Sequence, residues 1–256
     1  MTDRRPPFTG VGVALVTLFD RSGGLDADAT ASHARHLVDR GVAGVLVAGS
    51  TGEAASLDAD ERSRLLTAVR AAVDGRAPVI AGTGAPSSRQ AVTLSQRAEA
   101  GGADALLTLS PPGTDDPRRY YEAVAAAVGV PVLAYHYPTA SAPGIPVDLL
   151  CELPVAGLKD STGDPARLAV ELDQMGGGVY TGSAALVLQA RAMGASGAIL
   201  ALANVDPDGC ARAWDGDGPC QRELVNGHRS GALTGIAGIK RALAGLYGTS
   251  AVTRLG

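Results

Sequence analysis

The alternation of short apolar runs with amphipathic stretches is the feature that most constrains the fold of this chain of 256 residues. Eight runs consist mostly of Val, Ile, Leu, Ala and Gly and lack a clean period of two. Such continuous runs predict parallel strands that are buried on both faces. The predicted strands comprise residues 12–18, 43–48, 78–81, 103–109, 131–135, 155–158, 179–181 and 197–202.

The stretches between these runs carry recognisable helix ends. Asp58 has the residue type of an N-cap, Glu61 follows three residues later, and Gly75 marks the predicted end of the helix. A second helix is predicted from Ser87 to Gly101. The apolar stripe of the first helix comprises Leu65, Leu66, Val69 and Val73.

Eight strands that alternate with helices predict an α/β fold, a (β/α)8 barrel. A doubly wound open sheet is the competing fold, but it usually has fewer strands and a single Gly-rich phosphate turn. Here polar residues follow most of the predicted strands, which favours the barrel. We expect residues 8–205 to form a catalytic barrel and residues 206–256 to form a shortened C-terminal helical region that packs on it.

Composition argues against several classes of partner. The net charge is −4 without a basic cluster and aromatic residues make up 4%, so binding to nucleic acid or to an anionic membrane is not expected. The three cysteines, without a C-x-x-C pair, argue against a disulfide framework and a structural zinc site. The N-terminus lacks the apolar core of a signal peptide, and no run approaches the ~20 residues of a membrane span. We therefore expect a cytoplasmic protein.

The second predicted strand ends in AGSTGEAASL, a polar and glycine-rich turn. Ser50 and Thr51 offer two hydroxyl groups, and Gly49 and Gly52 allow a ligand to approach backbone N–H groups closely. These groups together are suited to hold a small carboxylate. The alternative interpretation is a turn that only begins the next helix.

The fifth predicted strand ends in AYHYP. A phenol at this position, such as that of Tyr135, is a competent proton donor and acceptor when it is positioned against a substrate. The alternative is an aromatic plug at the mouth of the barrel.

Lysine occurs only twice in the chain, at Lys159 and Lys240, and arginine supplies the other basic side chains. Lys159 directly follows the sixth apolar run, where partial desolvation favours a neutral amine that can attack a carbonyl. The alternative is a surface ion pair with Asp160, a role that the arginine preferred elsewhere would fill equally well. Lys240 lies in a helical pattern and is predicted to be on the surface of that helix.

Metal chemistry has few candidate ligands in this sequence. His33 and His36 form an i,i+3 pair in the first predicted helix, and a solvated helix face is expected rather than a metal site. At the strand ends His136 is the single candidate ligand, which disfavours a metal-dependent aldolase.

Three motifs, GSTGE, YHYP and GLKDSTGD, occur in an order and spacing that resemble the dihydrodipicolinate synthase / N-acetylneuraminate lyase family. The resemblance extends from about residue 11 to residue 248. Its members are class I, pyruvate-dependent aldolases on a (β/α)8 barrel. The resemblance implies that Lys159 is the Schiff-base lysine, that Tyr135 shuttles protons, and that Ser50 and Thr51 bind the pyruvate carboxylate. The expected substrate-binding set comprises Gly49, Ser50, Thr51, Gly52, Gly182, Ser183 and Ile199.

Departures from the family pattern narrow the expected substrate. Ala140 stands where dihydrodipicolinate synthases have an arginine, and the segment SPPGTDDP lacks the tyrosine that they contribute across a dimer interface. Ser183, Ala184 and Ala185 stand where sialate lyases carry acidic residues. The segments GLKDSTGD, GSA and ALANV resemble those of 4-hydroxy-2-oxoglutarate aldolases more closely.

We therefore expect a lyase that forms or cleaves a carbon–carbon bond between pyruvate and an aldehyde, similar to 4-hydroxy-2-oxoglutarate aldolases. Its partners would be a small 2-oxo acid and an aldehyde, and it would need no cofactor and no metal. It would form a homo-oligomer, a dimer or a tetramer. Three alternatives stay open: a hydratase-aldolase or dehydratase that acts on a longer 2-oxo acid, a dihydrodipicolinate synthase, and a non-catalytic barrel that binds a ligand.

Overall fold

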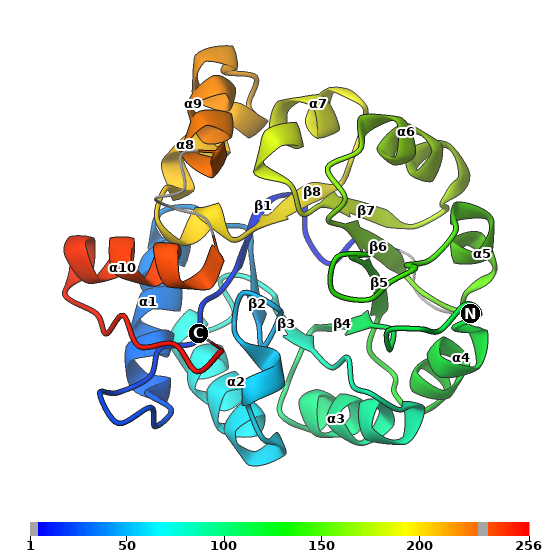
Figure 1. Ribbon diagram of the computed structural model, residues 1–256, viewed down its shortest axis with the longest axis horizontal. Coiled ribbons are helices and arrows are strands. Elements are labelled where there is room, and N and C mark those ends of the chain that lie inside the picture. The colour runs from blue at the N-terminus through cyan, green and yellow to red at the C-terminus, as the bar shows by residue number, and fades with distance from the viewer. Residues whose placement is uncertain (1–4, 230–234, 256) are drawn as a thin grey trace.

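A computed structural model describes residues 5–229 and 235–255 and shows a closed barrel of eight parallel strands (Figure 1). Each strand pairs with its neighbours in chain order, and β1 closes the barrel on β8. All eight predicted strands are present, with ends that shift by a few residues. The strands are β1 (Gly10–Ala14), β2 (Gly44–Val47), β3 (Val79–Gly82), β4 (Ala105–Leu109), β5 (Val132–His136), β6 (Gly157–Asp160), β7 (Gly178–Thr181) and β8 (Gly197–Leu200).

Helices follow the strands and surround the barrel on the outside (Figure 1). Two of them, α9 and α10, come after the helix that follows β8. The boundary between residues 205 and 206 that the sequence suggests stays a prediction. The helices are α1 (Ala27–Asp39), α2 (Ala59–Val73), α3 (Ser88–Ala100), α4 (Arg118–Ala126), α5 (Val147–Glu152), α6 (Pro165–Gln174), α7 (Val187–Ala192), α8 (Pro207–Trp214), α9 (Gly218–Arg229) and α10 (Gly235–Tyr247).

The helix ends follow the local chemistry read from the sequence. The Asp58 carboxylate accepts the N–H groups of residues 60 and 61, and the Glu61 carboxylate accepts the Asp58 N–H, so a complete capping box begins α2. Ser87 caps α3, and Gly101 ends it. All four apolar residues of the predicted stripe on α2 are buried, which confirms the face that this helix turns to the barrel.

An aromatic pair, Phe8 and Tyr180, fills the part of the barrel near the start of β1. The Tyr180 hydroxyl donates to the Phe8 carbonyl oxygen at 2.7 Å, and the two ring centroids are 4.8 Å apart. Glycines make room for this plug, because a Cβ atom on Gly12 or Gly44 would lie only 2.5 or 2.6 Å from the Phe8 ring. The sequence did not single out Phe8. With this end filled, the other end, where the strands finish, is left for a ligand.

The prediction that Lys240 lies on a helix surface is wrong. Its side chain is fully buried in α10, where it pairs with the equally buried carboxylate of Glu53. Its ammonium group also donates to the Val252 carbonyl oxygen at 2.8 Å and lies 4.3 Å from the centre of the Phe19 ring. The reason lies in the tertiary structure. The C-terminal segment, residues 249–255, contacts both Lys240 on α10 and Glu53 in the turn after β2, and so covers a face that the helix alone would expose.

The prediction of a solvated face at His33 and His36 is also wrong. His33 is buried, His36 is half-buried, and both rings pack against the ring of Tyr247 at the end of α10. Burial lowers the pKa of His33 to about 4. In the described parts of the chain, no three His, Cys, Asp or Glu side chains are grouped so as to hold a metal ion.

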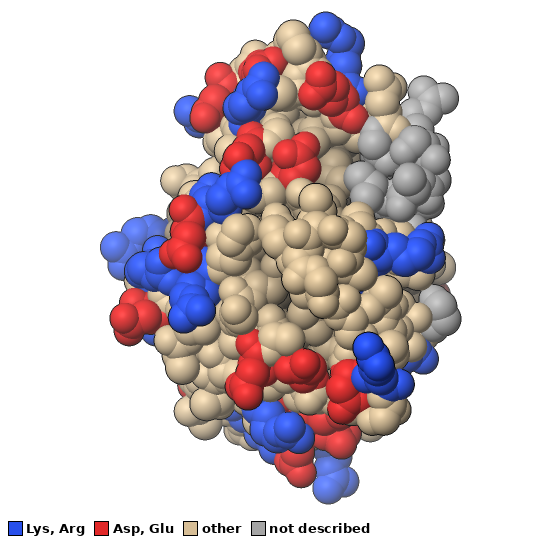
Figure 2. All heavy atoms as spheres, turned by 90° about the vertical axis from the view of Figure 1, so that its left-hand side faces the viewer, with Lys and Arg blue, Asp and Glu red and all other residues tan. Residues whose placement is uncertain are grey.

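Charges of both signs are interspersed on the surface. Figure 2 views the left-hand side of Figure 1, where α1 and α10 lie, and shows acidic and basic side chains around an uncharged central area. Ion pairs such as Arg40 with Asp208 link neighbouring helices on the surface. None of the helices that the structure describes combines the length and the apolarity that crossing a bilayer requires.

Candidate active site

The site is centred on Lys159, the third residue of β6. The pairing of β5 with β6 sets Tyr135 directly beside Lys159. Tyr135 belongs to the cluster that fills the barrel interior, and side chains opposite each other on paired strands share a face. The two side chains are only 5% and 6% exposed, and the Lys159 ammonium nitrogen lies 4.5 Å from the centre of the Tyr135 ring. An amine and a phenol are thus held together where the sequence predicted them.

Asp160 is not the partner of this lysine. Its carboxylate accepts the Thr162 N–H at 3.0 Å and the Thr162 hydroxyl at 2.6 Å, and burial raises its pKa. Successive residues of a strand point to opposite faces, so Asp160 turns away from the interior that holds Lys159. Over residues 5–229 and 235–255, no carboxylate lies within ion-pairing distance of Lys159. The alternative of a surface ion pair is therefore wrong.

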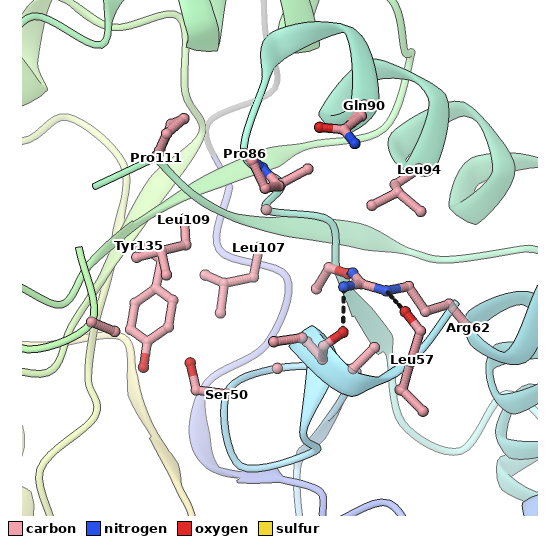
Figure 3. Close-up of a pocket in the computed structure, with 18 of the residues that line it drawn as sticks. Ser50, Leu57, Arg62, Pro86, Gln90, Leu94, Leu107, Leu109, Pro111 and Tyr135 are labelled. Carbon is pink, nitrogen blue, oxygen red and sulfur yellow. Dashed lines mark hydrogen bonds between the residues drawn. The ribbon is translucent and has the colours of Figure 1, made fainter. Parts of the chain in front are cut away.

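Ser50 lies in the turn that follows β2, and its hydroxyl points toward the hydroxyl of Tyr135 (Figure 3). The turn is narrow because the Glu53 N–H donates to the Ser50 carbonyl oxygen at 3.1 Å. Ala48 and Glu53 at its two ends both adopt left-handed backbone conformations, with φ angles of 50° and 53°. This backbone directs the serine hydroxyl toward the phenol.

The other residues of this turn have different surroundings. Gly49 lines the same cavity as Ser50. Gly52 packs against the end of β1, since a Cβ there would lie 2.9 Å from the Leu15 carbonyl oxygen, and its own carbonyl accepts the Thr17 hydroxyl. Thr51 is half-buried and does not line the cavity. Substrate contacts of Thr51 and Gly52 therefore stay predictions.

Sequence reasoning missed Ser161. Its hydroxyl lies 3.4 Å from the Tyr135 hydroxyl and is placed to donate to it. The sequence could have indicated this residue, because side chains two positions apart on a strand lie on the same face, and Ser161 follows Lys159 by two residues. A Cβ on Gly182 would lie 2.0 Å from the Ser161 hydroxyl and 2.9 Å from Cε of Lys159. The predicted site residue Gly182 thus leaves room for these two side chains, which a larger residue would displace.

Two further predicted residues lie near this centre. Ile199 is buried in the interior cluster that also contains Tyr135. Ser183 begins a single 3-10 turn (Ala184–Leu186), where its hydroxyl accepts the Ala185 N–H at 3.3 Å. Capping accounts for this serine, so substrate binding by Ser183 stays a prediction.

His136, the neighbour of Tyr135, points to the outside of the barrel. Its Nδ1 atom accepts the Ile145 N–H at 2.9 Å, and burial lowers its pKa to about 4. Tyr137 instead stacks on Tyr135, with the ring centroids 5.6 Å apart and the planes inclined by 16°. The neutral histidine holds the loop after β5, while the tyrosine pair faces the site.

A cavity of about 770 Å³ opens beside Tyr135 and Ser50 and extends toward α3 (Figure 3). Its walls come from the turns after β2, β3 and β4, from the start of α3 and from Leu255 near the C-terminus. Lys159 does not line this space, but its ammonium nitrogen lies 4.5 Å from the centre of the Tyr135 ring, which does. The cavity therefore adjoins the amine without enclosing it.

Comparisons with known proteins agree with this geometry. Residues 7–215 match the model of the dihydrodipicolinate synthetase family. A 4-hydroxy-tetrahydrodipicolinate synthase of Pseudomonas aeruginosa is 37% identical over 229 residues, which are 84% of this chain and 78% of that protein. An uncharacterised DapA-like lyase of Halobacterium salinarum is 38% identical over 91% of this chain and 79% of its own length.

A solved structure carries the same fold. YagE, a prophage protein of Escherichia coli that belongs to the dihydrodipicolinic acid synthase family and was solved in complex with pyruvate, superposes with a TM-score of 0.88. It is 27% identical, over 97% of this chain and 92% of that one. The motif resemblance, the closed barrel and these matches lead to one conclusion: the chain belongs to the dihydrodipicolinate synthetase family of lyases.

Proposed function

We propose that the protein is a class I aldolase or lyase that binds pyruvate as an imine on Lys159 and joins it to, or releases it from, an aldehyde. The single observation that carries this proposal is the buried amine of Lys159, which faces the Tyr135 ring and has no carboxylate partner among the described residues. An amine held in this way is placed to act as the nucleophile toward a ketone. The pyruvate complex of YagE is consistent with a 2-oxo acid as the substrate.

The chemistry assigns a task to each side chain. The Lys159 amine adds to C2 of pyruvate, and loss of water gives a protonated imine, which withdraws electrons from C3. Removal of a C3 proton gives an enamine, whose C3 attacks the aldehyde carbon while the new alkoxide takes a proton. Tyr135, with Ser161 3.4 Å from its hydroxyl, is the group that gives and takes these protons. Water then hydrolyses the imine and frees the lysine.

Ser50 is the proposed partner of the pyruvate carboxylate. Its hydroxyl points into the same space as that of Tyr135 (Figure 3), and a hydroxyl donor to a carboxylate makes a charge-assisted hydrogen bond. Holding the acid at this point orients the ketone for attack, and such orientation contributes much of the rate in reactions of this kind.

The identity of the aldehyde has two candidates from comparison. The motifs resemble those of 4-hydroxy-2-oxoglutarate aldolases, for which the aldehyde would be glyoxylate. The names of the relatives favour 4-hydroxy-tetrahydrodipicolinate synthesis instead. Against that second reaction stands Ala140, which lines the cavity where the resemblance would place an arginine.

Reductive trapping tests the proposal. Borohydride added with pyruvate should fix the mass of reduced pyruvate on the peptide that contains Lys159 and leave the peptide of Lys240 unlabelled. Since the chain has only these two lysines, peptide mapping gives a clear assignment. Lys159→Met should abolish the label. Labelling that persists in this variant, or that maps to Lys240, would refute the assignment.

The expected homo-oligomer also stays a proposal. One dihydrodipicolinate synthase variant of the same fold, 25% identical with a TM-score of 0.87, is described as monomeric. Light scattering of the purified protein measures which state this chain adopts.

A further inference from the structure

The cavity beside Tyr135 has walls that are mostly apolar. This matters because, under the proposed function, the cavity is where the aldehyde would meet the enamine. Its volume of about 770 Å³ is typical of sites for ligands much larger than a two-carbon or four-carbon aldehyde. The apolar residues around it are Ala48, Ala54, Ala55, Leu57, Ala59, Ala85, Pro86, Leu94, Leu107, Leu109, Pro111, Pro112, Ala140 and Leu255. The polar ones are Ser50, Arg62, Arg89, Gln90, Thr93, Ser110 and Tyr135.

Arg62 lines the cavity, and backbone carbonyls occupy three of its five N–H donors. Its guanidinium donates to the carbonyl oxygens of Ala54 at 2.6 Å and of Gly82 at 3.1 Å. It also donates to the carbonyl oxygen of Leu57 at 3.4 Å (Figure 3). Burial lowers its pKa. One donor on each nitrogen of this arginine is thus bound to the backbone of the turn after β2 or the end of β3, which fixes the side chain as part of the wall.

One other charged residue, Arg89, lines the cavity, and it is exposed on the first turn of α3, at the outer rim. None of the lining residues, all of which lie in the described part of the chain, is an aspartate or a glutamate. The inner part of the cavity, between Ser50 and Tyr135 on one side and Leu107 and Leu109 on the other, therefore contains hydroxyl groups but no charge that is free of backbone partners.

Desolvation decides which aldehyde fits such a space. An aldehyde with a carboxylate next to its carbonyl would have to leave water for walls whose inner cation, Arg62, already binds three backbone carbonyls, and a buried charge that is poorly paired is costly. An aldehyde with a planar apolar body gains from leaving water in proportion to the area it buries. Leucine and proline side chains on several sides provide that contact.

We infer that the acceptor aldehyde of this enzyme carries an uncharged aryl body, which lies between the turns after β3 and β4 and points toward α3. The inference rests on the proposed imine chemistry. The enamine C3 bonds to the aryl aldehyde carbon, the alkoxide takes the Tyr135 proton, and hydrolysis releases a 4-aryl-4-hydroxy-2-oxo acid. A polar substituent on the far side of the ring would reach Arg89 at the rim.

The test compares benzaldehyde with glyoxylate as partners for pyruvate, measured by the loss of each aldehyde with the full chain. We expect kcat/KM for benzaldehyde to exceed that for glyoxylate by about tenfold or more, the discrimination that an apolar pocket supplies. Equal rates, a preference for glyoxylate, or no turnover of benzaldehyde would overturn the inference.

Trapping with pyruvate and borohydride, run in parallel without aldehyde, separates the two proposals. If pyruvate labels Lys159 but benzaldehyde is not turned over, the aryl inference fails and the imine chemistry stands. If Lys159 is not labelled, both fail.

A substitution that places a positive charge in the cavity provides a second, independent test of the inference. Ala140→Arg should raise the ratio of glyoxylate to benzaldehyde turnover about tenfold, because it supplies a further cation. Thr139→Arg is the matched control, since Thr139 is exposed beside Ala140 and does not line the cavity. It should leave the ratio unchanged. A shift of the same size in the control, or none in Ala140→Arg, would contradict the assignment of this cavity to the acceptor.

Discussion

Lys240→Met removes the cation from the buried ion pair with Glu53, and the structure sets the size of the expected loss. Both side chains are 0% exposed. Methionine has nearly the length of lysine and fills the space beside the Phe19 ring, so the change deletes charge more than volume. Glu53 keeps two backbone donors on its other oxygen, from Arg254 at 2.7 Å and from Leu255 at 2.9 Å.

The carboxylate of Glu53 would nevertheless be left buried without a cation. Removing one partner of a buried pair destabilises proteins by about 3–5 kcal/mol. For a chain of this size, that loss corresponds to a decrease in melting temperature of roughly 6–20 °C. Urea unfolding, followed by circular dichroism, measures the free energy of unfolding directly.

The double variant Lys240→Met with Glu53→Gln tests the cause. A neutral amide at position 53 still accepts the Arg254 and Leu255 N–H groups but carries no charge to leave unpaired. We expect the double variant to recover about 1–3 kcal/mol relative to Lys240→Met alone, as directly interacting pairs do. Arg241→Met, an exposed cation on the same helix, is the control and should change stability by less than about 0.5 kcal/mol.

The reasoning would be refuted if Lys240→Met cost no more than Arg241→Met. It would also be refuted if the double variant were less stable than Lys240→Met, because the loss would then come from packing and not from an unpaired charge.

Three further predictions concern the site and the buried histidine. Tyr135→Phe should keep the pyruvate label on Lys159 but lower the rate of carbon–carbon bond formation by about 10²–10⁴, the usual contribution of a positioned proton donor; unchanged turnover would remove Tyr135 from the mechanism. Gly182→Ala should sharply reduce labelling, since its Cβ would lie 2.9 Å from Cε of Lys159, whereas Gly245→Ala, with open space around its Cβ, should not. His33 titrates near 6.5 when unfolded but has a pKa of about 4 when folded, so the unfolded state binds the extra proton and the protein loses stability as pH falls from about 6.5 to about 4. His33→Asn should lose less stability over that range, and an identical pH profile for the two proteins would contradict this assignment.

Local chemistry made much of the fold predictable. The eight apolar runs marked the strands because a strand covered on both faces needs apolar residues at successive positions. Asp58 with Glu61, and Ser87, marked helix starts because their side chains satisfy the free N–H groups of the first turn. Lys159 and Tyr135 were recognisable because their residue types are unusual at the ends of apolar strands.

Contacts between distant segments were not predictable in the same way. Ser161 became a site residue only because β5 and β6 pair in a register that sets it near the Tyr135 hydroxyl. Arg62 lines the cavity because three backbone carbonyls from the turn after β2 and the end of β3 converge on its guanidinium, which residue type alone does not indicate.

The sequence by itself predicted the barrel, the starts of two helices, and Lys159 and Tyr135 as the candidate amine and phenol, because each depends on residue types a few positions apart. The tertiary structure alone decided that Lys240 and His33 are buried, since Lys240 is covered by Phe19, Glu53 and Val252, and His33 packs against Tyr247. It also decided the character of the cavity beside Tyr135, whose walls come from the turns after β2, β3, β4 and β5, from α2 and α3, and from Leu255. Burial and ion pairing depend on which distant segments come together in the fold. The pattern of neighbouring residues in the sequence does not specify those contacts.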